Sequence, residues 1–216
     1  MYPDALRRIK RTLLLSAPIV LILNGFFVAA QWWAVSPNGS EAILWLSILL
    51  IFPLIFSLAM IPVAILLSFF TKIRRYAFRI GISCAVYFLI GIVCINIGQR
   101  VRMNAFHKLA LRSRPLIEAI KTFETKHGIS PPTLDALVPL FLPSVPSTGM
   151  AAYPKYEYIV GEEAEKWENN PWVVYVETPS GGLNWDIFMY LPKQNYPQKG
   201  FGGVVEKVDD WAYVHE

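Results

Sequence analysis

Three long apolar runs dominate the first half of the chain. They extend from Leu13 to about Trp33, from Ile43 to Phe70 and from Ile80 to about Ile97. Each run can form a helix of about 20 residues, the length that crosses the hydrocarbon core of a bilayer. The second run is the longest, so we expect its helix to tilt or bend at Pro53 or Pro62. The pattern predicts a membrane domain over residues 1–98 with three transmembrane helices.

A helical pattern continues beyond the third run. Apolar residues recur at spacings of three, four and seven, at Phe106, Leu109, Leu116, Ile120 and Phe123. This is the stripe of an amphipathic helix, and the residues between them are largely polar. We expect a helical stalk that is kinked or restarted at Pro115 and that ends at Gly128, which tolerates the left-handed backbone of a helix end.

The hydrophobic period changes to two in the last third of the chain. Aromatic and β-branched residues alternate with others in 156–160, 172–178, 185–191 and 208–216, and polar or glycine-rich segments join them. These are features of strands. Residues 99–216 are therefore predicted to form an α+β domain, in which the long helix packs on an antiparallel sheet of three or four strands.

Charge adds an orientation to this picture. Residues 1–104 carry ten Lys and Arg against two acids, and residues 105–216 carry ten against fourteen, so the net charge of +4 is +8 followed by −4. Basic residues precede the first run and fill the segment 71–79, whereas the segment 36–42 has none. The positive-inside rule places the N-terminus in the cytoplasm and the domain 99–216 outside it. Arg100 and Arg102, just after the third run, run against this trend.

The first run also has the features of a secretory signal peptide. A basic segment precedes its apolar stretch, and small residues, Val28 to Ala30, come before Gln31. Trp32 and Trp33 instead favour an interfacial anchor of a retained helix. In both alternatives the domain 99–216 lies on the outer side of the membrane.

The composition argues against several classes of function. The three apolar runs contain no Asp, Glu, Lys, Arg or His, which argues against a transporter or pump. Cys84 and Cys94 lie ten residues apart on one predicted helix, too far for a disulfide. The outer domain has no cysteine, so a cysteine-ligated metal is excluded, and we expect no cofactor. The basic charge belongs to the membrane flanks, so we expect no nucleic-acid partner.

Two groups of polar residues are candidate metal-binding or catalytic sites. Glu124 and His127 have the spacing used in di-iron sites, but such sites need further copies, so structural roles at the helix end are expected for them and for Asp135. At the C-terminus, Asp209, Asp210 and His215 form a possible polar cluster, because a strand would place Asp209 and His215 on one face with Trp211 and Tyr213. No catalytic residue and no metal ligand is assigned.

Aromatic residues are unusually dense in the outer domain. Residues 151–216 contain thirteen of them, more than one buried sheet face requires. One explanation is a core filled with large rings. The other is an exposed surface for a protein or a glycan, for which the candidate residues are Trp167, Trp172, Trp185, Trp211 and Tyr213.

The order of these elements resembles a known family. A membrane helix runs into an amphipathic helix, then into EAIKTFETKHGISPPTLDALVPLFLPSVP and antiparallel strands. Over about residues 80–146 this is similar to type IV pilin-like proteins, above all the major pseudopilin of type II secretion. The matching positions are Phe123, Gly128, Pro131, Leu134, Leu137, Val138 and Pro139. The third run has no acidic residue of the kind that follows a prepilin leader, and two runs precede it, so the resemblance implies a pilin-like domain fixed in a membrane.

These features favour a multi-pass protein of the bacterial inner membrane with an extracytoplasmic, pilin-like interaction or scaffold domain. Its expected partners are the lipid bilayer and other envelope proteins or glycan. Two alternatives stay open. One is a membrane-anchored envelope enzyme that uses the C-terminal Asp and His residues, and the other is a divergent pseudopilin-related secretion component.

Overall fold

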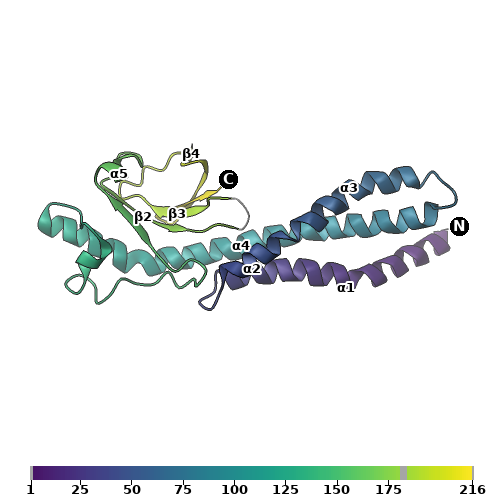
Figure 1. Cartoon of the computed structure of the whole chain (residues 1–216), viewed down its shortest axis with the longest axis horizontal. Helices are drawn as coiled ribbons and strands as arrows, with labels where there is room; N and C mark the ends of the chain where they lie inside the picture. Colours follow the sequence, from purple (N-terminus) through teal and green to yellow (C-terminus); the bar gives the residue numbers. More distant parts are fainter. Residues whose placement is uncertain (1, 181–183, 216) are drawn as a thin grey trace. The chain divides into compact units, whose positions relative to one another are not determined.

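The computed structural model describes residues 2–180 and 184–215, and the chain divides into two compact units (Figure 1). One comprises Met1–Trp32 and Ala42–Val101 and is called the helical unit here. The other comprises Trp33–Glu41 and Arg102–Glu216 and is called the sheet unit. The short segment after the first apolar run thus belongs to the same unit as the C-terminal half of the chain.

The helical unit is built from α1 (Tyr2–Ala34), α2 (Glu41–Ile48), α3 (Ile51–Leu67) and the first part of α4 (Arg74–His127). Three helical stretches are long and apolar enough to cross a membrane, namely Ile9–Ala34, Glu41–Leu67 and Arg74–His127. This confirms the three candidate spans. The second is interrupted between Ile48 and Ile51, next to Pro53, whose ring crowds the carbonyl four residues earlier. Pro62 lies inside α3 without an interruption.

Glycines on α4 allow close packing inside the helical unit. A Cβ atom on Gly91 would come within 2.5 Å of Leu54 Cδ1 on α3 and 3.3 Å of Asn24 Oδ1 on α1. A Cβ atom on Gly98 would lie 3.1 Å from Gln31 Cγ on α1. Small residues at such contacts are typical of helices that associate in lipid, where close backbone approach replaces the hydrophobic effect.

Helix α4 is continuous for 54 residues, from Arg74 to His127, and includes Pro115. The alternative of a helix restart at Pro115 is therefore wrong. Only one backbone hydrogen bond is lost to a proline inside a helix, and the apolar stripe on both sides of Pro115 is buried against the sheet. The helix ends as predicted. Gly128 has φ 72°, and its N–H donates to Glu124 O at 2.8 Å.

The sheet has six antiparallel strands, not three or four, in the order β1-β2-β3-β6-β5-β4. The strands are β1 (Glu157–Val160), β2 (Trp172–Glu177), β3 (Ile187–Tyr190), β4 (Lys199–Gly200), β5 (Gly203–Val208) and β6 (Trp211–His215). The predicted strand 208–216 is present as β6 but begins only at Trp211, because Val208 belongs to β5 and pairs with Trp211 across a tight turn at Asp209 and Asp210. Strand β5 was missed because its sequence, GVVEKV, directly follows a glycine-rich segment.

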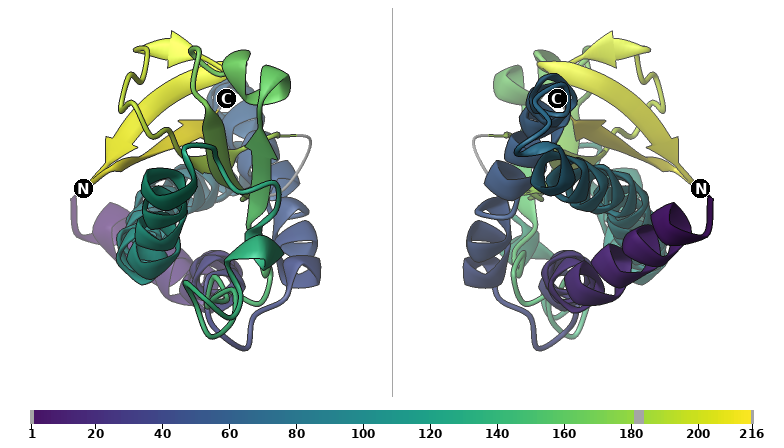
Figure 2. Two further views of the ribbon diagram at one scale, coloured as in Figure 1. Left: turned by 90° about the vertical axis from the view of Figure 1, so that its left-hand side faces the viewer. Right: turned by 90° about the vertical axis from the view of Figure 1, so that its right-hand side faces the viewer.

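Both faces of the sheet are covered. On one face, Phe106 of α4 lies 4.9 Å from Phe188 and 4.8 Å from Tyr213, measured between ring centroids. On the other face, Ala164 of α5 (Glu162–Glu165) packs with Val173, Met189, Leu191 and Val214 in a cluster that Trp167 and Phe201 border. Figure 2 shows the strands lying to one side of α4. The buried pattern of β2 and β6 follows, because strands covered on two faces lose the alternation of polar and apolar residues.

Candidate functional site

Arg102 is the centre of a buried polar cluster in the sheet unit. Its side chain is 1% exposed, and Asp186, just before β3, is 2% exposed. Arg102 Nη2 lies 3.8 Å from Asp186 Oδ2 and donates to Thr178 O at 2.6 Å. Arg102 Nη1 donates to Tyr153 Oη at 3.1 Å, and Tyr213 Oη donates to Asp186 Oδ2 at 2.6 Å. We call these five residues the base cluster.

Aromatic rings surround the charges of the base cluster. The Arg102 guanidinium lies 5.3 Å from the ring centroid of Phe106 and 5.9 Å from those of Tyr153 and Tyr213. Burial raises the pKa of Tyr153 and that of Tyr213 above the ordinary value, although the charge of Arg102 opposes the shift. Both hydroxyls therefore stay protonated and remain donors. The cluster is buried and ties the middle of α4 to the end of the β2–β3 hairpin.

A second charged contact links α4 to the turn between β5 and β6. His107 Nδ1 lies 2.9 Å from Asp209 Oδ2. Unlike the base cluster, both side chains are about half exposed. Asp209 has φ 55°, a left-handed conformation that Asp tolerates better than most residues and that the tight turn requires. This contact sets the position of the turn over the helix.

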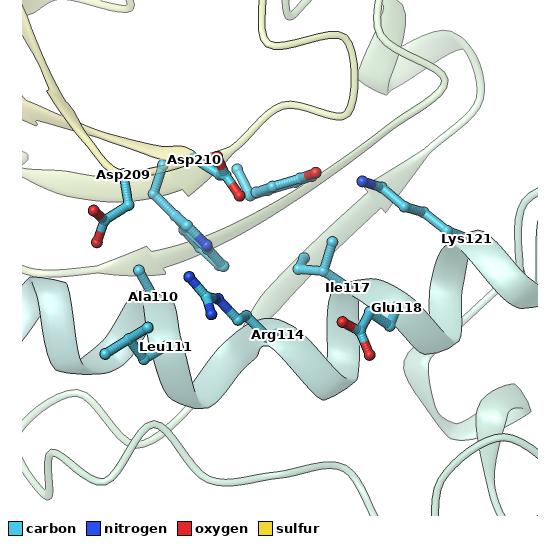
Figure 3. Close-up of a pocket in the computed structure, with 10 residues that line it drawn as sticks. Ala110, Leu111, Arg114, Ile117, Glu118, Lys121, Asp209 and Asp210 are labelled. Carbon is cyan, nitrogen blue, oxygen red and sulfur yellow. The ribbon is translucent and has the colours of Figure 1, made fainter.

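Beside that turn lies a groove of about 240 Å³ between α4 and the sheet. Its lining from α4 comprises Ala110, Leu111, Arg114, Ile117, Glu118 and Lys121, and its lining from the sheet comprises Tyr190, Asp209, Asp210 and Trp211. In Figure 3, Arg114 rises from the helix toward the turn that carries Asp209 and Asp210, and Lys121 lies at the other end. Lys121 Nζ is 5.5 Å from the ring centroid of Tyr190.

The groove presents both signs of charge. Arg114 and Lys121 lie two helical turns apart on α4 with Glu118 between them in the sequence, and the carboxylates of Asp209 and Asp210 lie on the opposite wall. Among the residues that the structure describes, no ion pair joins these cations to Asp209 or Asp210. Such a surface suits a ligand that carries both carboxylate and ammonium groups, for example an extended peptide segment.

The structure distributes the five aromatic candidates between core and surface. Trp172, Trp211 and Tyr213 are 0–2% exposed and belong to the core, so they are not available as an exposed binding surface. Their rings stack within the sheet layer, with Phe188 and Trp211 at 5.1 Å between centroids. Trp167 is half-buried against the rings of Tyr175 and Phe201. Trp185 is 80% exposed.

The structure does not bring the C-terminal polar cluster together. Asp209 contacts His107, and His215 Nε2 lies 3.9 Å from Glu206 Oε2. Asp210 contributes its carbonyl, which accepts hydrogen bonds from Gln194 Nε2 at 2.9 Å and Tyr196 Oη at 2.7 Å. The expected common face fails because Asp209 and Asp210 occupy a turn and not the strand.

The polar candidates at the end of α4 make separate contacts and do not form a common site. Glu124 Oε1 accepts a hydrogen bond from Ser130 Oγ at 2.7 Å, and the His127 ring lies 4.4 Å from the Phe123 ring. Asp135 lies in the short 3₁₀ helix Leu134–Leu137. Within 2–180 and 184–215, no group of three or more His, Cys, Asp or Glu side chains could hold a metal ion.

The base cluster and the groove were both missed from the sequence. In the sequence, Arg102 stands out only as a basic residue just after the third apolar run, and His107 belongs to no recognisable motif. The one signal was Arg102 itself, an arginine on the side that the positive-inside rule expects to be poor in basic residues. Its buried carboxylate partner, Asp186, lies 84 positions later, and no sequence pattern distinguishes it from other acidic residues.

The fold combines three candidate membrane-spanning helices with a helix-covered antiparallel sheet. Comparisons with protein-family models, with curated proteins and with solved structures found no match to this chain.

Proposed function

We propose that this chain is a multi-pass protein of the bacterial inner membrane, with a cytoplasmic N-terminus and an extracytoplasmic sheet unit that binds another envelope component. The observation that carries the proposal is the hydrogen bond from Ala151 N–H to Ser36 O, at 3.1 Å. It joins the segment between the first two spans to the domain after the third. Three crossings put both on one side of the membrane, and the basic flanks assign that side to the outside.

The helical unit supports a membrane location in a second way. Large apolar side chains such as Leu15, Ile22, Phe52 and Phe69 are 66–79% exposed along its helices. In water, a surface of this extent would drive aggregation, whereas lipid tails cover it without cost.

The groove beside α4 is the proposed binding surface of the sheet unit. It places Arg114 and Lys121 opposite two carboxylates, and its lining also includes the apolar side chains of Leu111 and Ile117. Convergent polar groups beside apolar lining are typical of a binding site. We favour an envelope protein over a glycan, because a peptide supplies both charges in one ligand.

We also propose that the sheet unit has a pilin-like fold. Its support is a long helix that ends at Gly128, the 3₁₀ helix Leu134–Leu137 and the antiparallel sheet that follows. A role as a processed secretion subunit is the competing version. Mass spectrometry of the purified chain that showed loss of the first two spans would favour that version.

Topology is tested by labelling single cysteines in spheroplasts, in a variant with Cys84→Ala and Cys94→Ala. We expect an impermeant maleimide to label Asn38→Cys and Leu140→Cys without lysis, and Lys72→Cys only after lysis. The reverse pattern would refute the orientation.

Binding is tested with a photo-crosslinking amino acid in intact cells. Position 114 lines the groove, and position 125, also exposed on α4, does not and serves as the matched control. We expect a discrete adduct from position 114 that is absent at 125 and lost with Asp209→Lys and Asp210→Lys. Equal adducts at both positions would contradict a groove-specific partner.

A further inference from the structure

Trp185 is the one exposed aromatic side chain among the described residues of 102–215, at 80% exposure. It lies immediately before Asp186, which is 2% exposed. An isolated exposed Leu needs no explanation, but a whole indole ring in water next to a buried, fixed residue is unusual. Its position in the sheet unit indicates what covers it.

The base cluster fixes the position of Trp185 along α4. Asp186 contacts Arg102, and Arg102 also binds the carbonyl of Thr178 on the other arm of the hairpin. Arg102 follows Ile97, the end of the third apolar run, by five residues. At about 1.5 Å per residue, this is about 7 Å along the helix. The residue that holds Asp186 is therefore only about 7 Å beyond the third apolar run along α4.

A second set of contacts, also inside the sheet unit, connects the base cluster to the segment that follows the first apolar run. Tyr153 accepts a hydrogen bond from Arg102 and donates one to Pro179 O at 2.6 Å. Two residues before Tyr153, the Ala151 N–H binds Ser36 O. Ser36 follows Trp33, where the first apolar run ends. Two segments that each follow an apolar run by a few residues, at Ser36 and at Arg102, thus meet at the same part of the sheet unit.

The chemistry of Trp185 fits the headgroup region of a bilayer. Tryptophan is enriched there because it has a large apolar ring and one N–H donor. In the sequence, Trp32, Trp33 and Trp45 flank the segment 36–42, whereas no tryptophan flanks the segment 68–79. Trp185 would extend this one-sided belt. The neighbouring carboxylate of Asp186 is buried against Arg102, so it does not repel anionic headgroups.

We propose that Trp185 inserts its ring into the headgroup region of the membrane that the helical unit crosses. This proposal rests on the proposed location of the sheet unit at the outer face. The domain then has a non-covalent attachment to lipid in addition to its covalent connection through α4.

The test compares two positions of equal exposure in the full chain. Trp185 is 80% exposed and Leu140 is 81% exposed. Each is replaced by Cys in the Cys84→Ala, Cys94→Ala background, spin-labelled and reconstituted in phosphatidylethanolamine–phosphatidylglycerol vesicles. We expect the ratio of collisions with oxygen to collisions with a water-soluble nickel complex to be several-fold higher at 185 than at 140. Equal ratios would overturn the proposal.

Two further measurements separate this proposal from its alternatives. Fluorescence quenching by brominated lipid should decrease in Trp185→Phe relative to the unaltered chain, and an unchanged quenched fraction would refute insertion. If a label at position 185 is accessible to water in vesicles but protected in cells, the lipid proposal is wrong and a protein partner covers Trp185 instead. The proposed topology is judged independently, by maleimide labelling at position 140, so its failure is distinguishable from that of lipid insertion.

Discussion

Two contacts between a nitrogen-bearing side chain of α4 and a carboxylate attach the helix to the sheet side of the domain, and they differ in length and in burial. Arg102 and Asp186 are 3.8 Å apart and almost completely buried. His107 and Asp209 are only 2.9 Å apart but about half exposed. The shorter contact is the weaker one, because water screens both partners and competes for their hydrogen bonds.

The buried pair depends on its surroundings. The Coulomb attraction of a buried pair offsets its loss of hydration only where further hydrogen bonds satisfy the charges. Tyr213 and Asn184 donate to Asp186 Oδ2, and Tyr153 and Thr178 accept from Arg102. Two atoms, Arg102 Nε and Asp186 Oδ1, are buried without a partner. Removal of either charge therefore leaves the other in an apolar site.

The largest expected effect is that of Asp186→Ala. We expect the free energy of unfolding of the sheet unit to fall by about 3–5 kcal/mol, because Arg102 keeps its charge and loses its carboxylate. Tryptophan fluorescence of the full chain in detergent, titrated with urea, measures this change. A loss below about 1 kcal/mol would show that the pair behaves like an exposed one.

Removal of both charges should cost less than removal of one. In Arg102→Met combined with Asp186→Leu, neither charge is left alone, so we expect recovery of at least about 1 kcal/mol relative to Asp186→Ala. The same urea titration on Arg102→Met alone, on Asp186→Leu alone and on the double variant completes the thermodynamic cycle. Additive losses would show that the two side chains act independently.

Alkaline pH should weaken the base cluster. Burial raises the pKa of Tyr153 and of Tyr213 above 10.0, so above that pH the folded state retains protons that the unfolded state releases. Their contribution to stability is fully present below pH 10 and is lost progressively above it. Urea midpoints across this range should fall with pH, and the slope should be shallower in Tyr153→Phe. Equal slopes would exclude Tyr153 as a source.

The smallest expected effect is that of Asp209→Asn. Asn tolerates the left-handed backbone at this position, so the substitution removes the charge without straining the turn. We expect a loss of no more than about 1 kcal/mol, which high salt should abolish. A loss above about 2 kcal/mol, or one insensitive to salt, would show that the turn depends on this contact far more than its exposure indicates.

The sequence predicted the elements with a strong, regular period. The three apolar runs, the amphipathic stripe from Phe106 to Phe123 and the helix end at Gly128 are all present. It failed at the β5–β6 hairpin, whose two strands are adjacent in the sequence. The segment VDDWAYV reads as a strand, but a tight turn at Asp209 and Asp210 allows β5 to pair with β6.

The candidate site was less predictable than the fold. Asp209 and Asp210 were selected from the sequence, but with His215 as their partner, whereas the structure gives Asp209 to His107. Aromatic content likewise did not separate the buried Trp211 from the exposed Trp185. Exposure depends on which elements cover a side chain, and covering elements come from remote parts of the chain.

By itself, the sequence determined which segments avoid water and which alternate, because these properties depend on residues within one or two turns of each other. The tertiary structure alone decided which charges meet and which are buried. Arg102 and Asp186 form one contact, and His107 and Asp209 another, because α4 lies across the sheet. That placement follows from the summed burial of many apolar side chains, and no local pattern encodes the partner of a single charge.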